Sequence, residues 1–193
     1  SSLEEITIPP NVTSIGEEAF SNCRRLEIVI IPEKVTEINN FAFAECSALE
    51  SVTFQGEPEV TIGNSSFNSC IELKEVNFND AQVLSIGNNA FYNNNKLREI
   101  TLPETVTSIG SYAFSLTDLR EFTIPETVTE GNLGVGIFQA SVLLTTIRLD
   151  NTALVTIPED TLSGVLAFAF EGGDLGNFLI KDETQAVKFG PRN

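Results

Sequence analysis

One stretch of sequence occurs twice in this chain of 193 residues, and the repetition constrains the fold more than any other feature. IPPNVTSIGEEAF spans residues 8–20 and LPETVTSIGSYAF spans residues 102–114, so their shared core recurs 94 residues later. Alignment of the A-F pairs reveals further copies, at intervals of 23 or 24 residues, marked by Phe20, Phe43, Phe67, Phe91, Phe114 and Phe138. Copies in register at so short a period are typical of a solenoid, in which each repeat forms one turn.

Each repeat opens with the pattern L-x-x-[IVF]-x-[ILF], as in LEEITI at residues 3–8 and LREITL at residues 97–102. Apolar and polar residues alternate at the end of this pattern, which is typical of a short strand with one buried face. Proline cannot donate a ladder hydrogen bond, so it marks the end of pairing where it follows directly, at Pro9, Pro32, Pro103 and Pro125. The pattern therefore predicts one strand in each repeat.

The second half of each repeat contains V-x-x-I, then glycine or asparagine, and then x-x-A-F-x-x-C. Glycine and asparagine tolerate a positive φ or cap a helix start, and the last segment reads as a short helical turn. The predicted fold class is an α/β repeat solenoid with one short parallel strand per repeat of ~23–24 residues and short helical turns opposite. Stacking of the repeats should place the six phenylalanines in one buried column.

The repeats predict one domain, because no single repeat can bury its apolar face alone. About seven units fill residues 1–165. In residues 166–193, LAFAF, LGNFLI and AVKF resemble short strands separated by the turns EGGD and KDET. We interpret residues 166–193 as a β-rich C-terminal cap of the same domain, which covers the last open turn as solenoid ends require.

The formal net charge of −16 at pH 7 limits the classes of partner. A field of that sign repels phosphate backbones and anionic lipid surfaces, so we expect no nucleic-acid partner and no direct membrane insertion. No apolar run approaches the ~20 residues needed to span a bilayer, and the first residues show no signal-peptide pattern. The alternative interpretation is that the acidity only keeps an elongated protein soluble.

Residue types that often carry catalysis or hold metals are scarce. The chain contains no histidine, which removes imidazole bases, His-based triads and the commonest metal ligand. Cys23, Cys46 and Cys70 recur at the repeat interval, which predicts one buried position with reduced, structural thiols rather than a metal cluster or a disulfide. The carboxylate pairs fall at exposed positions and no calcium-loop pattern occurs, so we expect no enzyme activity, no metal site and no cofactor.

The outward face of the predicted strands offers the candidate site. Alternation exposes two rows of side chains, and we predict a protein-binding strand face at Glu75, Asn77, Glu99, Thr101, Glu121 and Thr123. Stacked glutamates repel one another, and the cations one residue earlier are expected to offset this in part, at Lys74, Arg98 and Arg120. Such an acidic stripe suits a basic protein partner, and a merely solvated face is the alternative.

The unit L-x-x-I-x-I-P-x-x-V-x-x-I-x-x-x-A-F-x-x-C resembles that of the BspA-like leucine-rich repeat family, well over residues 3–149 and loosely over residues 150–180. The resemblance implies a right-handed leucine-rich repeat superhelix. It also implies a bacterial or protozoan protein that is surface-exposed or secreted and adheres to host matrix proteins or other cells. The expected function is a non-enzymatic protein-binding module at the cell surface or outside the cell, with an extracellular matrix or cell-surface protein as partner. The alternative is a structural spacer or stalk that displays another domain.

Overall fold

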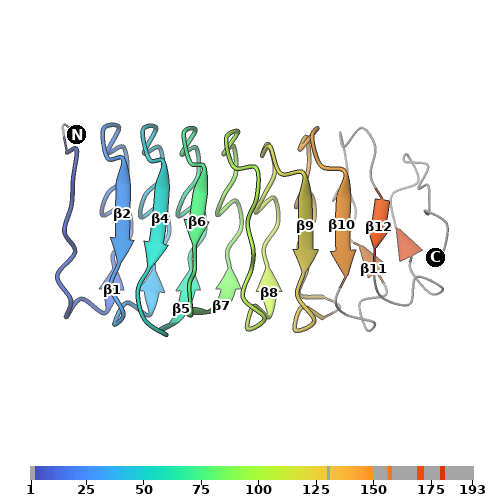
Figure 1. The fold of residues 1–193 in the computed structure, drawn as a ribbon, viewed down its shortest axis with the longest axis horizontal. Coiled ribbons are helices and arrows are strands. Elements are labelled where there is room, and N and C mark those ends of the chain that lie inside the picture. The colour runs from blue at the N-terminus through green and yellow to red at the C-terminus, as the bar shows by residue number, and fades with distance from the viewer. Residues whose placement is uncertain (1–2, 130, 150–155, 158–168, 172–178, 181–193) are drawn as a thin grey trace.

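The computed structural model describes residues 3–129, 131–149, 156–157, 169–171 and 179–180. Within these residues the backbone forms stacked turns, whose strands stand side by side along the long axis of the molecule (Figure 1). A regular turn contributes one strand to each of two rows, and the strands of the two rows point in opposite directions (Figure 1). The fold is therefore a β-solenoid with parallel strands in each row.

Apart from its last strand, the front row is built from the L-x-x-I-x-I segments. It forms two three-stranded parallel sheets, the first of β2 (Ile28–Ile31), β4 (Ser51–Phe54) and β6 (Glu75–Asn77), the second of β9 (Glu121–Ile124), β10 (Thr146–Leu149) and β12 (Ala169–Glu171). Residues paired across a ladder are equivalent positions of successive repeats, as with Val29, Val52 and Val76. The valine side chains are buried, whereas Ile28 points outward and is exposed. The predicted repeat strand is confirmed in β2, β4, β6, β9 and β10, whereas residues 5–8 and 99–102 lie in no strand; β12 falls in the predicted cap.

The back row is a second set of strands, so the prediction of one strand per repeat is wrong. The V-x-x-I segments form a five-stranded parallel sheet in the order β1 (Ser14–Ile15), β3 (Glu37–Ile38), β5 (Glu59–Ile62), β7 (Gln82–Ile86) and β8 (Ser108–Ile109). Equivalent isoleucines pair across it, and Ile15, Ile38 and Ile62 are buried. Three of these strands, β1, β3 and β8, have only two residues, which is too few for an alternating pattern to stand out in the sequence.

The segments predicted as short helical turns are not helical, and no residue in the described ranges lies in a helix. Two residues of a turn, four positions apart, have a positive φ, as with Glu18 at 55° and Asn22 at 59°. Left-handed residues of this kind do not continue a right-handed helix. Alternate N–H groups donate to the next repeat instead, from Glu18 to Asn40 O (3.1 Å) and from Phe20 to Ala42 O (2.8 Å). The turns thus form a third ladder, which replaces helical hydrogen bonding.

Close approach between turns, rather than a positive φ, explains the glycine after the V-x-x-I segment. A Cβ on Gly87 would lie 2.6 Å from the backbone N of Asn64 and 2.6 Å from the carbonyl C of Gly63. The same crowding occurs at Gly63, Gly110 and Gly134. Gly16, in the first turn, has no atom within 4 Å of such a Cβ. A side chain would therefore meet backbone of the preceding turn at these four glycines, whereas Asn39 occupies the equivalent position of the second turn, next to Gly16.

The six phenylalanines form the predicted column. From Phe20 to Phe114, successive ring centroids lie 5.2 to 5.4 Å apart with the rings nearly parallel. Phe20 is partly buried, and the other five are fully buried. The last pair, Phe114 and Phe138, is 6.4 Å apart, because the ring of Phe122 packs against both at 4.9 and 4.8 Å. The prediction of one buried column is confirmed.

The predicted cap, residues 166–193, lies mostly outside the described residues. Within it, β12 pairs in parallel with β10, and β13 (Leu179–Ile180) pairs in parallel with β11 (Thr156–Ile157). Both pairings join residues 23 positions apart, as Thr146 with Ala169, which is the interval of the repeats. The boundary at residue 165 and the cap stay predictions.

Candidate functional site

The residues predicted for the protein-binding face line one groove of about 970 Å³. Two of them come from β6, two from β9 and two from the intervening residues 99–102. Five of the side chains are exposed and the last is half-buried, in the order Glu75, Asn77, Glu99, Thr101, Glu121 and Thr123. The structure therefore brings together all the residues that alternation assigned to this face.

The groove lies where the front row is interrupted. Residues 99–102 occupy the place of a strand between β6 and β9 but pair with neither of them (Figure 1). Across the described part of the chain, the backbone N–H and C=O groups of these four residues have no hydrogen-bond partner. One hydrogen bond from Arg120 N to Arg98 O, at 3.3 Å, links the start of this segment to the next repeat. The face thus exposes unpaired backbone as well as side chains.

The interruption coincides with a shortened turn. Leu97 and Leu119, which open two successive repeats, are 22 residues apart, whereas the opening leucines of the other neighbouring repeats are 23 to 25 residues apart. The missing position falls between Phe114 and Leu119, directly before β9. This spacing is the sequence signal of the break, although repeat alignment alone does not reveal its effect on pairing.

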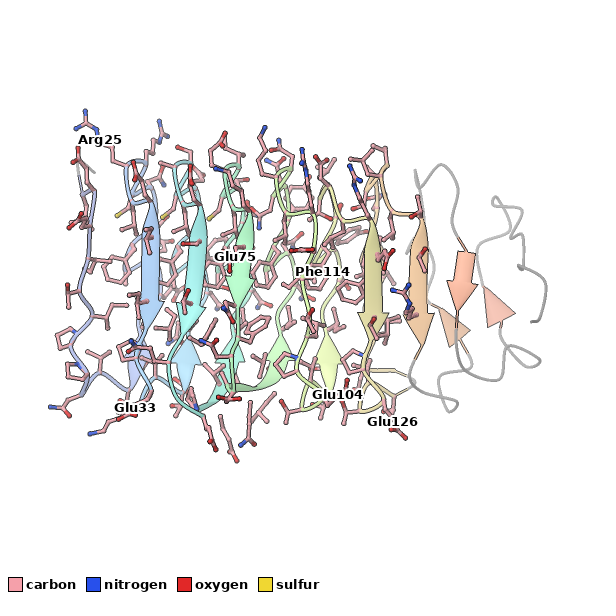
Figure 2. All side chains as sticks on the ribbon, in the orientation of Figure 1. Arg25, Glu33, Glu75, Glu104, Phe114 and Glu126 are labelled. Atoms are coloured by element: carbon pink, nitrogen blue, oxygen red, sulfur yellow. The ribbon has the colours of Figure 1, made fainter. Side chains whose placement is uncertain are left out.

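Beneath the groove, alternate side chains still face the core. Val76, Ile100 and Phe122 are all buried, although they come from two strands and an unpaired segment. Residues 99–102 therefore keep their side-chain packing without their ladder hydrogen bonds. The lining also includes Glu104, which the sequence reasoning missed; it follows Pro103, and Figure 2 shows it below Glu75, near the lower edge of the molecule.

The cations that line the groove are already paired. Lys74 Nζ lies 2.9 Å from Glu50 Oε1, and Arg148 Nη1 lies 2.6 Å from Glu121 Oε2. Lys74 therefore forms its ion pair with a glutamate of the preceding repeat. Among the residues described, the groove carboxylates without an ion-pair partner are Glu75, Glu99 and Glu104. The groove presents unmatched negative charge to solvent.

The cysteine position is buried and hydrogen-bonded, as expected for structural thiols. Cys46 Sγ donates to Phe20 O at 3.1 Å, and Cys70 Sγ makes the equivalent bond at 3.2 Å. Ser141 Oγ, at the same position of a later repeat, also makes this bond, at 2.9 Å. Both cysteines are free thiols. Asn94, at the same position, makes this bond through its side-chain amide, so the bond does not depend on sulfur.

These thiols predict a loss of stability at high pH. Burial raises the pKa of the Cys46 thiol from 9.0 to about 12 and raises the pKa of the Cys70 thiol well above 9.0. Between pH 9 and 12 the unfolded chain therefore loses thiol protons that the folded chain keeps, so stability falls as pH rises. Each thiol contributes a loss of about 1.4 kcal/mol per pH unit in this window. We expect the urea concentration at the unfolding midpoint to decrease as the pH is raised from 9 to 10.5.

The control is the double variant Cys46→Ser, Cys70→Ser. A hydroxyl does not titrate in this range, and Ser141 shows that serine can make the same hydrogen bond. The double variant should show a flatter decline, and the difference isolates the two thiols from other groups that titrate there. Equal pH dependence in the two proteins would show that the buried thiols ionise without unfolding.

A ladder of asparagine side chains runs along the turns and is absent from the sequence predictions. Asn40, Asn64 and Asn88 each accept a hydrogen bond at Oδ1 from the backbone N–H of the equivalent residue in the next turn. These bonds are 2.8 to 2.9 Å long. The recurrence of asparagine at intervals of 24 residues is the signal that could have revealed the ladder. Its side-chain oxygens join turns to one another.

Two other kinds of site are absent from the described ranges. No group of three or more His, Cys, Asp or Glu side chains there is arranged to hold a metal ion. No helix in the same ranges has the length and hydropathy of a membrane span. Within the described residues, the groove is the candidate binding site.

The fold is shared with solved leucine-rich repeat structures from bacteria. The leucine-rich repeat protein of T. pallidum superposes with a TM-score of 0.69 at 24% identity, over 80% of this chain and 70% of that chain. A leucine-rich cell surface protein of Faecalibacterium prausnitzii A2-165 gives a TM-score of 0.55 at 22% identity, over 87% of this chain and 62% of that chain. At these identities the likeness shows the fold alone. No curated protein sequence matches the chain.

The sequence itself matches a family. The profile of the BspA type leucine-rich repeat region matches in six copies, over residues 1–81 and 57–168. These ranges contain the stacked turns, the phenylalanine column and the groove. Proteins built from such repeats are typically protein-interaction modules, which agrees with an open strand face. The resemblance in the repeat pattern is thereby confirmed, and the chain belongs to the BspA-type leucine-rich repeat family.

Proposed function

We propose that this chain is a non-enzymatic protein-binding module of a surface-exposed or secreted protein, and that it takes part in adhesion to cells or host matrix. The groove between β6 and β9 is the proposed binding site. The observation that carries the proposal is that the outward residues of three successive repeats line one continuous groove. A groove on a rigid repeat scaffold is suited to recognition of another protein.

Charge and family membership support this proposal. The groove carries glutamates without cationic partners, and a complementary basic surface would gain both affinity and association rate from them. The F. prausnitzii protein of the same fold is described as a cell surface protein, which supports an extracellular setting for this chain as well. The chain spans 62% of that protein, so regions outside it also bear on the activity of a whole protein of this kind.

The test is binding of the purified chain to extracellular matrix glycoproteins at physiological salt. The triple variant Glu75→Lys, Glu99→Lys, Glu121→Lys should weaken saturable binding by about tenfold or more, because each lost ion pair is worth ~0.2–1 kcal/mol and each reversal adds repulsion. Surface plasmon resonance measures the dissociation constants. The matched control reverses three exposed glutamates away from this groove, at Glu17, Glu37 and Glu59.

Each outcome has a distinct meaning. Binding that survives the groove variant but not the control would move the site to another face. Equal weakening by both variants would mean that net charge, rather than the groove, governs association. Absence of binding by every well-folded protein, judged by thermal melts, would favour the alternative function as a spacer that displays another domain.

A further inference from the structure

The groove contains a run of backbone that has lost its partners. Residues 99–102 leave four consecutive N–H and four C=O groups without hydrogen bonds in the part of the chain that the structure describes. The neighbouring repeats satisfy the same groups by strand pairing, as in β4, which pairs with β2 on one side and β6 on the other. An extended backbone with unused donors and acceptors is the feature that recruits an added strand.

The strands on either side of this segment are open toward it. β6 pairs with β4 alone, and β9 pairs with β10 alone, so each presents one unpaired edge to the groove. The groove of about 970 Å³ lies over these edges and the unpaired segment between them. A strand that enters here therefore meets backbone hydrogen-bonding groups rather than a surface of side chains alone.

The charges specify the chemistry of the entering strand. Glu75, Glu99 and Glu104 have no ion-pair partner among the described residues, and the nearby Lys74 and Arg148 are committed to other glutamates. Outward side chains of a strand recur at every second residue, about 6.6 Å apart. An added strand with lysine or arginine at alternate positions would therefore direct several cations toward the glutamates of the groove.

We propose that the groove binds an extended, lysine- or arginine-bearing segment of a partner protein, which adds as a strand to the unpaired backbone of residues 99–102. This inference rests on the proposed protein-binding function and names the class of partner. A folded basic surface without a free extended segment can meet the carboxylates but cannot satisfy the backbone groups. Strand addition uses both features of the groove.

The test uses the peptide acetyl-Lys-Val-Lys-Val-Lys-Val-amide with the whole chain. Two further peptides of the same sequence carry a methyl group on the backbone nitrogen, one peptide at its lysines and the other at its valines. Each keeps its charge but loses the backbone N–H donors of one strand edge. We expect the parent peptide to bind and at least one methylated peptide to bind at least tenfold more weakly. Equal affinity of all three peptides, or no binding by the parent, would overturn strand addition.

Hydrogen exchange reads the site directly. In the free protein the amides of residues 99–102 should exchange much faster than those of Val52 and Thr53, which lie in a strand paired on both sides. Saturating parent peptide should slow exchange within 99–102 at least tenfold and leave the β4 amides unchanged. Binding without this protection would mean docking by charge alone and would overturn the proposal.

Charge variants complete the design. Glu99→Gln combined with Glu104→Gln should weaken binding of the parent peptide three- to tenfold, whereas Glu37→Gln combined with Glu59→Gln, away from this groove, should not. Failure of this inference is distinguishable from failure of the proposed function. Matrix binding that depends on the groove, without peptide protection, removes only strand addition; peptide protection without any matrix binding removes only the adhesive role.

Discussion

Replacing Phe91 by alanine should lower the free energy of unfolding by about 3–5 kcal/mol. Phe91 is fully buried, and its ring centroid lies 5.4 Å from those of Phe67 and Phe114. The substitution removes contacts in both directions along the column. Neighbouring turns cannot close the resulting cavity easily, because ladder hydrogen bonds hold their spacing near ~4.8 Å. Urea unfolding followed by circular dichroism measures the change.

The matched control is Phe20→Ala at the end of the column. Phe20 is partly buried, and in the described part of the chain its ring stacks on one neighbour, Phe43, at 5.2 Å. Its loss should cost less than half as much as the loss of Phe91. If both variants lost stability equally, the position of a ring within the column would not matter, and the column would not be the cooperative core inferred here.

Replacing Gly87 by alanine should lower the free energy of unfolding by about 1–3 kcal/mol, because the added methyl group overpacks the space between two turns. The Cβ would lie 2.6 Å from backbone atoms of Asn64 and Gly63, and backbone cannot rotate away as a flexible side chain can. Relief requires two turns to separate, which lengthens hydrogen bonds on each side of the contact. Thermal and urea melts of the single variant measure the cost.

Gly16→Ala provides the control within the same sequence pattern. No atom lies within 4 Å of its Cβ position, so the variant should be neutral or more stable by up to about 1 kcal/mol through the reduced freedom of the unfolded chain. A neutral result at both positions would refute the close-approach explanation for the glycine. A large loss at both would instead indicate a backbone conformation that only glycine adopts.

The period and the column of the solenoid could be predicted because they depend on repetition. Phenylalanines at a constant interval must superpose when turns stack, whatever the path of the chain between them. The turns could not be predicted in the same way. A-F-x-x-C has helical spacing, but positive φ at Glu18 and Asn22 rules out a helix, and neither residue type demands that conformation. Hydrogen bonds to the next turn decide the outcome, and a single repeat does not contain them.

The candidate site could be predicted to the same extent. Strict alternation placed Glu75, Glu99 and Glu121 on one face, and the structure agrees. Alternation does not report whether neighbouring strands pair, so it did not reveal the gap at residues 99–102. It also could not assign ion pairs, because the long side chain of Arg148 reaches Glu121 from the following repeat. The sequence alone shows which residues face outward, whereas the packing between turns decides whether the strands that carry them pair.

The break in the front row also has a mechanical consequence. Around residues 99–102 the back row remains joined through β7 and β8, and the turns remain joined by bonds such as Phe91 N to Ala113 O at 2.9 Å. At this level the hydrogen-bond ladders of the back row and of the turns are therefore continuous, whereas that of the front row is interrupted. An elastic rod that lacks one of its three ladders at one level bends most easily there, toward or away from the missing ladder. Tension or bending of the molecule would concentrate there and change the width of the groove. A segment bound in the groove would stiffen the molecule at this level.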